Sequence, residues 1–265
     1  MASHVGWGEA WNAKPQHVAS CWGSLRSPQP TGLLPSASRR PSTCFSEEHR
    51  RYHYIYDAPI AFSRPSLQAT MSLADRERWN RKYAAGNPHP SFAPDPILTQ
   101  YAHLLGGNGW ALDIACGVGH NALFLARRGY EVVAVDGSLI GLQYGRAAAR
   151  ESALPVHFVA ADLDRFAPPP RRFNLILVTR FLSRPLLPLL KEALAPGGLM
   201  IYQTFNLNWR RANPAFNPDF LLAPGELAGA FGDFEVIATN DAANIADDLT
   251  YWIGRRPIGA LTPVS

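Results

Sequence analysis

From residue 97 onward, short β-rich runs alternate with segments that carry a helical hydrophobic pattern. The β-rich runs are expected to form strands at 110–116, 131–136, 156–162, 173–179, 198–205, 234–239 and 250–256. The helical patterns fall between most of them, at 119–128, 138–151, 183–195 and 223–231. Strands that alternate with helices build a mostly parallel sheet with helices on both faces. The sequence therefore predicts an α/β fold, with a Rossmann-like, doubly wound, mostly parallel sheet of seven strands.

Two connections depart from this alternation. The link 163–172, between the third and fourth runs, is short and holds three consecutive prolines, which predicts a crossover without a full helix. The polar segment 241–248 joins the last two runs and favours an antiparallel last strand. Ser183 is expected to cap the next helix, with Pro185 in its first turn, and that helix is expected to stop around Pro196.

The N-terminal residues 1–70 have a different character from the rest of the chain. They are rich in serine, proline and arginine and show no sustained helical or strand period. Such a composition buries too little apolar area to offset the entropy of ordering. A helical pattern then begins abruptly at Met71, with Ser72 as its expected cap. We expect 1–70 to be a disordered leader or a mis-assigned start and 71–265 to be the functional domain, the alternative being a targeting or partner-binding tail.

Charge and composition narrow the classes of function. The net charge is +4, and most of it lies within 1–70, so the predicted domain is nearly neutral. It lacks the concentrated basic patch that nucleic-acid binding needs. No apolar run reaches the roughly 18 residues of a membrane span. Three cysteines at unrelated spacings indicate neither disulfides nor a metal site. We therefore expect a cytoplasmic protein without a metal and without nucleic-acid or membrane partners.

The segment 111–136 joins a predicted strand, a glycine-containing turn, a helix and a second strand. Gly117 and Gly119 let the backbone turn tightly and approach a ligand without an intervening Cβ atom. Asp136 ends the second strand, where a carboxylate can accept hydrogen bonds from a ribose diol, and Gly137 follows it. This pattern is typical of nucleotide binding, but alone it does not separate a nicotinamide dinucleotide from S-adenosylmethionine.

Two further carboxylates favour S-adenosylmethionine. Asp113 lies four residues before Gly117, where a dinucleotide fold usually has an apolar residue because a pyrophosphate has no cation to pair. S-adenosylmethionine carries an ammonium and a sulfonium group, so an acidic residue beneath the turn suits it. Asp162 follows the third strand, where it can accept from the adenine amino group, and Leu163 can flank the adenine ring.

Other candidate site residues come from separate parts of the chain. Arg180 follows the fourth strand and faces the crevice where open α/β sheets bind ligands, so it would hold the cofactor's carboxylate or an anionic substrate. Trp79 and Tyr83 share one helix face, which either packs on the sheet or covers the cofactor with Tyr83 near its edge. His120 is expected beside the cofactor. Three roles are open to it: a contact with the cofactor, a general base, or no part in the site. The irregular segment 206–227, which is rich in aromatic residues, is expected to form one wall of the acceptor-binding site.

Together these segments resemble class I S-adenosylmethionine-dependent methyltransferases, and within them the branch related to tellurite-resistance methyltransferases. The matching segments are 77–86, 111–138, 160–166, 180–205 and 217–237.

The resemblance implies roles for individual residues. It assigns Asp113, Gly117 and Gly119 to the methionine end of the cofactor, Asp136 to the ribose, and Asp162 with Leu163 to the adenine. In the general acidic-x-G-x-G-x-G pattern, Ala115 and Asn121 stand in place of the first and third glycines. Alanine is expected to be tolerated there with a negative φ, as part of the cofactor turn.

The resemblance also implies a reaction, the transfer of a methyl group from S-adenosylmethionine to a small-molecule acceptor by in-line displacement. The cofactor carries the reactive group, and the protein supplies orientation and desolvation. A soft sulfur, selenium or tellurium acceptor needs no protein base, and no catalytic residue stands out for an oxygen or nitrogen acceptor. Residues 178–181 lack the Asn/Asp-Pro-Pro-aromatic turn expected for methylation of exocyclic base amines. The alternatives are a non-catalytic S-adenosylmethionine-binding protein and an NAD(P)-dependent oxidoreductase.

Overall fold

The computed structural model describes residues 73–86, 90–242 and 246–259. The expected leader 1–70, the expected start at Met71 and the expected cap Ser72 lie outside the described residues. Among the described helices, none combines the length and the apolar character needed to cross a membrane.

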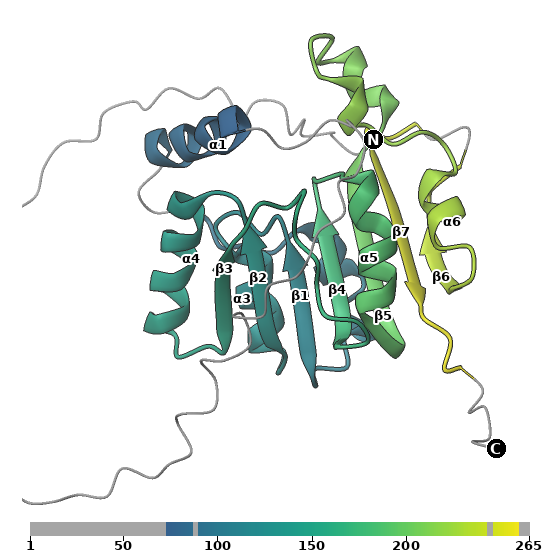
Figure 1. Cartoon of the computed structure of the whole chain (residues 1–265), viewed down its shortest axis with the longest axis horizontal. Coiled ribbons are helices and arrows are strands. Elements are labelled where there is room, and N and C mark those ends of the chain that lie inside the picture. Colours follow the sequence, from purple (N-terminus) through teal and green to yellow (C-terminus); the bar gives the residue numbers. More distant parts are fainter. Residues whose placement is uncertain (1–72, 87–89, 243–245, 260–265) are drawn as a thin grey trace, which may run out of the picture. The chain divides into compact units, whose positions relative to one another are not determined.

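The described residues form a seven-stranded sheet with the strand order β3-β2-β1-β4-β5-β7-β6 (Figure 1). Its strands are β1 (Trp110–Ile114), β2 (Glu131–Asp136), β3 (Val156–Ala160), β4 (Phe173–Thr179), β5 (Leu194–Phe205), β6 (Glu235–Thr239) and β7 (Leu249–Arg255). Strands β1 to β5 pair in parallel, and β7 runs antiparallel to both β5 and β6. The predicted α/β fold, its seven strands and its antiparallel last strand are confirmed.

Helices follow most of the strands, as the alternating pattern predicts. The α-helices are α1 (Leu73–Ala85), α2 (Pro96–Gln100), α3 (His120–Arg127), α4 (Leu139–Glu151), α5 (Leu187–Ala193) and α6 (Glu226–Ala230). The short 3-10 helices are η3 (Ala102–Leu104), η4 (Arg184–Leu186), η5 (Leu207–Arg211) and η6 (Pro218–Phe220). The proline-containing link between β3 and β4 forms only a turn, which confirms the prediction of a crossover without a full helix.

The predicted helix 183–195 needs two corrections. Ser183 precedes η4 as expected, with Pro185 in the first turn, but its side chain makes no capping hydrogen bond. The helix also ends earlier than expected, at Ala193, because Leu194 is extended and already pairs with Phe173 at the start of β5. Strand pairing therefore ends the helix before Pro196 is reached.

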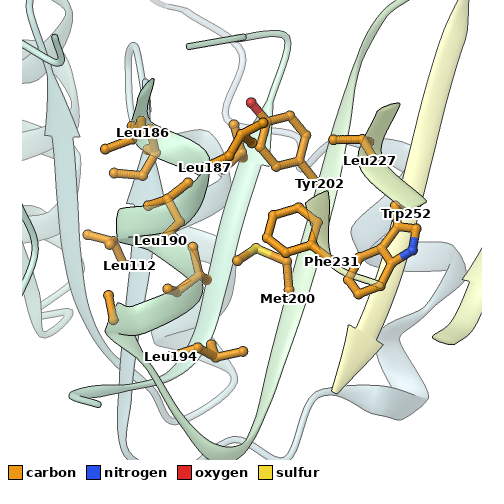
Figure 2. Packing of buried hydrophobic residues seen from close by; sticks show 14 of the residues in the cluster. Leu112, Leu186, Leu187, Leu190, Leu194, Met200, Tyr202, Leu227, Phe231 and Trp252 are labelled. Carbon is orange, nitrogen blue, oxygen red and sulfur yellow. The ribbon is translucent and has the colours of Figure 1, made fainter. Parts of the chain in front are cut away.

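The two faces of the sheet bury separate hydrophobic cores, as alternating side chains on a strand require. One core joins α5 and α6 to the sheet and includes Leu190, Tyr202 and Trp252. Figure 2 shows Phe231 of this core between Tyr202 and Trp252, and its ring stacks on Trp252 at a centroid distance of 5.0 Å. The other core joins α2, α3 and α4 to the opposite face. Because both faces are covered, the carboxyl edge of the parallel strands is left for the site.

Candidate functional site

The turn between β1 and α3 lies at the carboxyl edge of the sheet. Ala115, Gly117 and Gly119 all have positive φ angles, of 56°, 56° and 77°. A Cβ atom on Gly119 would lie 2.5 Å from Cε1 of Phe158, and one on Gly117 would collide with the Tyr83 hydroxyl. Only glycine fits these two positions without displacing a neighbour. Both glycines singled out in the sequence are therefore required by the local backbone.

Two expectations about this turn are wrong. Alanine is tolerable in this turn if its φ is negative, but the φ of Ala115 is positive, and this left-handed conformation costs an L-residue about 1–2 kcal/mol. Strain of this kind persists where the surrounding structure holds it, commonly at ligand sites. Asn121 does not replace a glycine, because the spacing from Asp113 puts Ala115, Gly117 and Gly119 at the three glycine positions. Asn121 instead lies in the first turn of α3 and is 1% exposed.

Asp136 ends β2 and holds the glycine turn in place. Its Oδ2 accepts a hydrogen bond from the Gly117 N–H at 2.8 Å, and its Oδ1 accepts one from the Ser138 N–H at 2.7 Å. Burial raises the pKa of Asp136 above its ordinary value, while the backbone N–H groups of Ser138, Gly117 and Gly137 oppose that rise. A carboxylate can accept about four hydrogen bonds, so Asp136 keeps acceptor capacity for ligand hydroxyls beside its backbone partners.

Asp113 lies on β1 beneath the turn and is 1% exposed. Within the described part of the chain, neither of its carboxylate oxygens has a hydrogen-bond partner. Burial raises the pKa of Asp113 well above its ordinary value, the charges of Asp95 and Asp136 raise it further, and the nearby Ala122 backbone N–H lowers it by less. A buried carboxyl group without a partner is rare in native proteins, so this one suits a cationic ligand.

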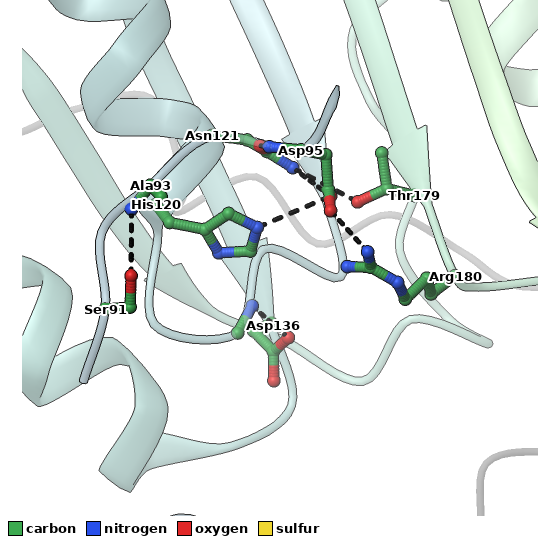
Figure 3. A network of polar contacts seen from close by, with 9 residues as sticks. Ser91, Ala93, Asp95, His120, Asn121, Asp136, Thr179 and Arg180 are labelled. Carbon is green, nitrogen blue, oxygen red and sulfur yellow. Dashed lines mark hydrogen bonds and ion pairs between the residues drawn. The ribbon is translucent and has the colours of Figure 1, made fainter. Parts of the chain in front are cut away.

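Asp95 organises a polar network that the sequence did not suggest (Figure 3). Its Oδ2 accepts a hydrogen bond from Asn121 Nδ2 at 2.9 Å and lies 3.4 Å from Nε2 of His120. Its backbone N–H donates to Asn121 Oδ1 at 2.9 Å, and Asn121 Nδ2 also lies 3.2 Å from the Thr179 hydroxyl. Burial alone would raise the pKa of Asp95, but hydrogen bonds from His120 and Asn121 and the charge of Arg180 outweigh it and lower that pKa.

Arg180 follows β4 directly and forms an ion pair with Asp95, with Nη2 2.5 Å from Oδ1. The Asp95 side chain is 4% exposed, whereas the Arg180 side chain is 40% exposed. The backbone of Arg180 is left-handed, with φ 55°, and its N–H donates to the Gln203 carbonyl at 2.8 Å. Arg180 thus lies at the carboxyl edge, as expected, and its partner is a residue that the sequence analysis did not single out.

A cavity of about 350 Å³ lies at the carboxyl ends of β2 and β3, beneath α1. Its lining includes the predicted residues Gly137 and Asp162, together with Asn80 of α1 and Ala161. Leu163, in contrast, is 2% exposed and packs in the core below this edge, so it is not among the lining residues. The structure therefore brings Gly137 and Asp162 to one cavity beside Asp136 and places Leu163 underneath.

Helix α1 covers this edge of the sheet (Figure 1). The Ser138 hydroxyl donates to Asn80 Oδ1 at 2.7 Å, which ties α1 to the start of α4. Trp79 and Tyr83 stack with ring centroids 6.0 Å apart, as their spacing predicts, and the Tyr83 hydroxyl lies against Gly117. Burial raises the pKa of Tyr83 above its ordinary value, and the charge of Asp136 raises it further. Tyr83 is therefore a half-buried phenol beside the glycine turn.

The strand order, the strained glycine turn and the convergent carboxylates together describe a known kind of domain. Residues 111–198 match the family model described as a methyltransferase domain. A curated relative from Cereibacter sphaeroides, named "Ubiquinone biosynthesis O-methyltransferase", is 33% identical over 102 residues, which is 37% of this chain and 41% of the relative. The chain thus matches about two fifths of that relative's length.

Solved methyltransferase structures share the fold. TehB from Haemophilus influenzae has a TM-score of 0.51 and 17% identity, covering 68% of this chain and 66% of that chain. An S-adenosylmethionine-dependent methyltransferase from Mesorhizobium loti has a TM-score of 0.50 and 15% identity, covering 61% of this chain and 99% of that chain. At these identities the likeness shows the fold alone. The sheet and its helices have the Rossmann-like fold of such methyltransferases.

Proposed function

We propose that this protein transfers a methyl group from S-adenosylmethionine to a small-molecule acceptor. The observation that carries the proposal is Asp113, a buried carboxyl group without a partner, with Asp95 and Asp136 close enough to raise its pKa. S-adenosylmethionine brings an ammonium and a sulfonium group to such a site, and both are stabilised by nearby carboxylates. A dinucleotide would bring a pyrophosphate to the same place and add like charge.

Each candidate residue then has a task in holding the cofactor. Asp113 faces the cationic methionine end, and the backbone of Ala115, Gly117 and Gly119 allows the close approach. Asp136 accepts hydrogen bonds from the ribose hydroxyls through its remaining lone pairs. Gly137 and Asp162 line the cavity that suits the adenine ring, above the buried Leu163. Tyr83 of α1 covers the glycine turn, and Arg180 lies at the end of β4, on the side of the site that is left for the acceptor.

When bound, the cofactor supplies the sulfonium methyl group that the acceptor attacks. The protein's part is to hold the two reactants in line and to keep water out, which can lower a barrier by roughly 7–11 kcal/mol. The cover of α1 over the turn supports the second task. Two acceptor classes fit this description. The resemblance to tellurite-resistance methyltransferases favours a soft sulfur, selenium or tellurium nucleophile, which needs no base.

A hydroxyl acceptor is the second candidate, and a specific contact favours it. His120 lies 3.4 Å from the Asp95 carboxylate, so its second ring nitrogen can accept a proton while the first donates to Asp95. The name of the Cereibacter relative, an O-methyltransferase, agrees with this class. A non-catalytic S-adenosylmethionine-binding protein would keep the same pocket but show no turnover with either acceptor class.

Calorimetric titration of the full chain with S-adenosylhomocysteine, and separately with NADH, tests the proposal. We expect the first to bind and the second not to bind. Replacing Asp136 with alanine should weaken S-adenosylhomocysteine binding by roughly 10- to 100-fold, because charge-assisted hydrogen bonds to the ribose are lost. Asp136→Asn keeps one acceptor oxygen, but its NH2 group would face the N–H of Gly117 or Ser138, so it should also weaken binding, though by less than alanine. Binding of NADH in place of S-adenosylhomocysteine would make the protein an oxidoreductase candidate.

A further inference from the structure

The Arg180 side chain is built into the site but is only partly used there. A guanidinium group has five N–H donors. Among the described residues, the side-chain partner of the Arg180 guanidinium is the Asp95 carboxylate. The side chain keeps 40% of its surface exposed, although the carboxylate that holds it is 4% exposed. Arg180 therefore presents its remaining donors to solvent at the carboxyl edge of the sheet, while the buried Asp95 fixes its direction.

The Asp95 carboxylate, which anchors Arg180, is itself held by several hydrogen bonds. Asp95 has His120 and Asn121 as further partners, and its backbone N–H is held by the Asn121 side chain. Asn121 belongs to α3, and through Thr179 it also contacts the end of β4, the strand that Arg180 follows. The arginine backbone is locked in the left-handed region and hydrogen-bonded to Gln203 of β5. Such a pre-organised guanidinium group loses little entropy when it binds an anion.

The place of Arg180 in the sheet separates it from the cofactor's other contacts. The candidate cofactor residues Asp136, Gly137 and Asp162 follow β2 and β3, on one side of β1. Arg180 follows β4, on the other side of β1, and its N–H bonds β5. In open α/β sheets the crevice opens where the strand order reverses, here between β1 and β4. A cofactor that occupies the β1–β3 side leaves the β4–β5 side to the acceptor.

The cofactor's own carboxylate has another binding place available. Helix α3 begins at His120, directly after the glycine turn, and its N-cap Gly119 provides no side-chain cap. The N-terminus of a helix presents backbone N–H groups and a positive partial charge, which suit a carboxylate. Arg180 is therefore not needed for that group.

A lysine of α1 adds a second positive charge at the same edge of the sheet. Lys82 of α1 lies over the Trp79 ring, with Nζ 4.2 Å from the ring centroid. Burial lowers the pKa of Lys82 to about 8, and the charges of Arg78 and Arg180 contribute to that lowering. The positive charge of Lys82, like that of Arg180, favours an anionic ligand at this edge of the sheet.

We propose that Arg180 anchors an acceptor subsite that binds a carboxylate or similar anionic group on the methyl acceptor, with Lys82 assisting and Asp95 positioning the arginine. The inference rests on the proposed function and names its substrate class, a small molecule that carries both the methyl-accepting atom and an anionic group. The anionic group is bound and not methylated. Arg180 takes it through two parallel N–H donors, as guanidinium groups do with carboxylates.

The test uses two matched pairs of probes with the full chain saturated with S-adenosylhomocysteine. Mercaptoacetate is compared with 2-mercaptoethanol, and 3,4-dihydroxybenzoate with catechol, so that each pair differs by the anionic group. Ligand-observed NMR gives the dissociation constants. We expect the carboxylate-bearing member of at least one pair to bind 10-fold or more tightly. Arg180→Gln, which keeps the Cβ atom and adds no backbone strain, should reduce that preference to within about 2-fold.

Three further variants make the outcome specific. Arg172→Gln is the matched control, because Arg172 precedes β4 at the opposite edge of the sheet and stacks on Trp110. It should leave the preference unchanged. Arg180→Lys keeps the positive charge but lacks the two parallel N–H donors of a guanidinium group. It should keep only part of the preference for the carboxylate-bearing probe. Arg180→Gln combined with Asp95→Asn avoids a buried unpaired carboxylate and covers the case in which the single variant does not fold.

The outcomes distinguish this inference from the proposed function. If S-adenosylhomocysteine does not bind the unchanged protein, the proposed function fails before any probe is added. If it binds but neither carboxylate probe binds at millimolar concentration, or the preference persists undiminished in Arg180→Gln, the anionic subsite is wrong. A 10-fold loss of S-adenosylhomocysteine affinity in Arg180→Gln, with the probe preference intact, would assign Arg180 to the cofactor's carboxylate and also overturn the inference.

Discussion

Asp113→Leu is expected to make the cofactor-free protein more stable and, at the same time, to weaken S-adenosylhomocysteine binding by roughly 100- to 1,000-fold. The carboxyl group is 1% exposed and lacks a partner within the described residues, so its removal relieves a desolvation penalty. Replacing such a group with an apolar side chain typically stabilises by roughly 1–3 kcal/mol. Binding falls because the ligand's ammonium group loses its buried counter-charge.

Urea denaturation measures the stability half of this prediction, and calorimetry measures the binding half. Asp95→Leu is the informative contrast, because Asp95 is also buried but is fully paired with Arg180, Asn121 and His120. Its loss leaves three partners unsatisfied, so we expect a destabilisation of roughly 1–3 kcal/mol. If both variants change stability in the same direction, then Asp113 is not the uncompensated group that its environment indicates.

The stability of the cofactor-free protein should fall as the pH rises above the ordinary aspartate pKa of 3.8, in part because of Asp113. Burial raises the pKa of Asp113 in the folded state, so the native protein keeps a proton that the unfolded chain releases. As the pH rises from 3.8 to the folded-state pKa of Asp113, the free energy of unfolding therefore decreases. Asp136, whose pKa is also raised, acts in the same direction, whereas Asp95, whose pKa is lowered, contributes stability that is lost as the pH falls.

Thermal unfolding of the unchanged protein and of Asp113→Leu across this range measures the effect. The variant should show a shallower decline of the melting temperature with rising pH. Saturating S-adenosylhomocysteine should flatten the curve of the unchanged protein as well, because the ligand stabilises the ionised carboxylate. Parallel curves for the two cofactor-free proteins would contradict the raised pKa of Asp113.

Gly119→Val is expected to destabilise the fold by roughly 2–5 kcal/mol and to abolish S-adenosylhomocysteine binding. Gly119 has φ 77°, and a Cβ atom there would lie 2.5 Å from Cε1 of Phe158. The left-handed backbone costs about 1–2 kcal/mol for a residue with a side chain, and overpacking against a core ring adds about 1–3 kcal/mol. The same displacement moves the turn from which the cofactor is bound.

Urea denaturation and calorimetry of this variant need a matched glycine as the control. Gly229 in α6 is suitable, because a Cβ atom there would meet nothing within 4 Å. Gly229→Ala should be neutral or should stabilise by about 0.5–1 kcal/mol, as expected for a helix interior. If Gly119→Ala behaves like Gly229→Ala, then the turn tolerates a side chain, and close approach of the backbone is not what the glycine provides.

The fold class could be predicted from the sequence, because the hydrophobic period is a local property. All seven apolar runs became strands, and the polar link 241–248 preceded an antiparallel strand. The sequence also indicated that Asp113, Asp136 and Asp162 lie at one edge, since parallel strands end together at the carboxyl side. The glycines of the turn were also predictable from the sequence, although the side chains that exclude a Cβ atom there, Tyr83 and Phe158, lie far away in the chain.

Which of these residues interact depends on the tertiary structure. Asp95 meets Asn121, 26 residues away, and Arg180 meets that same Asp95 from the end of β4. No local pattern encodes such a pairing, because it depends on how α2, α3 and β4 pack together. The positive φ of Ala115 and the burial of Leu163 beneath the cavity were likewise set by the packed neighbours. The hydrophobic periodicity of a segment depends on neighbouring residues, whereas contacts and burial depend on residues far apart in the chain.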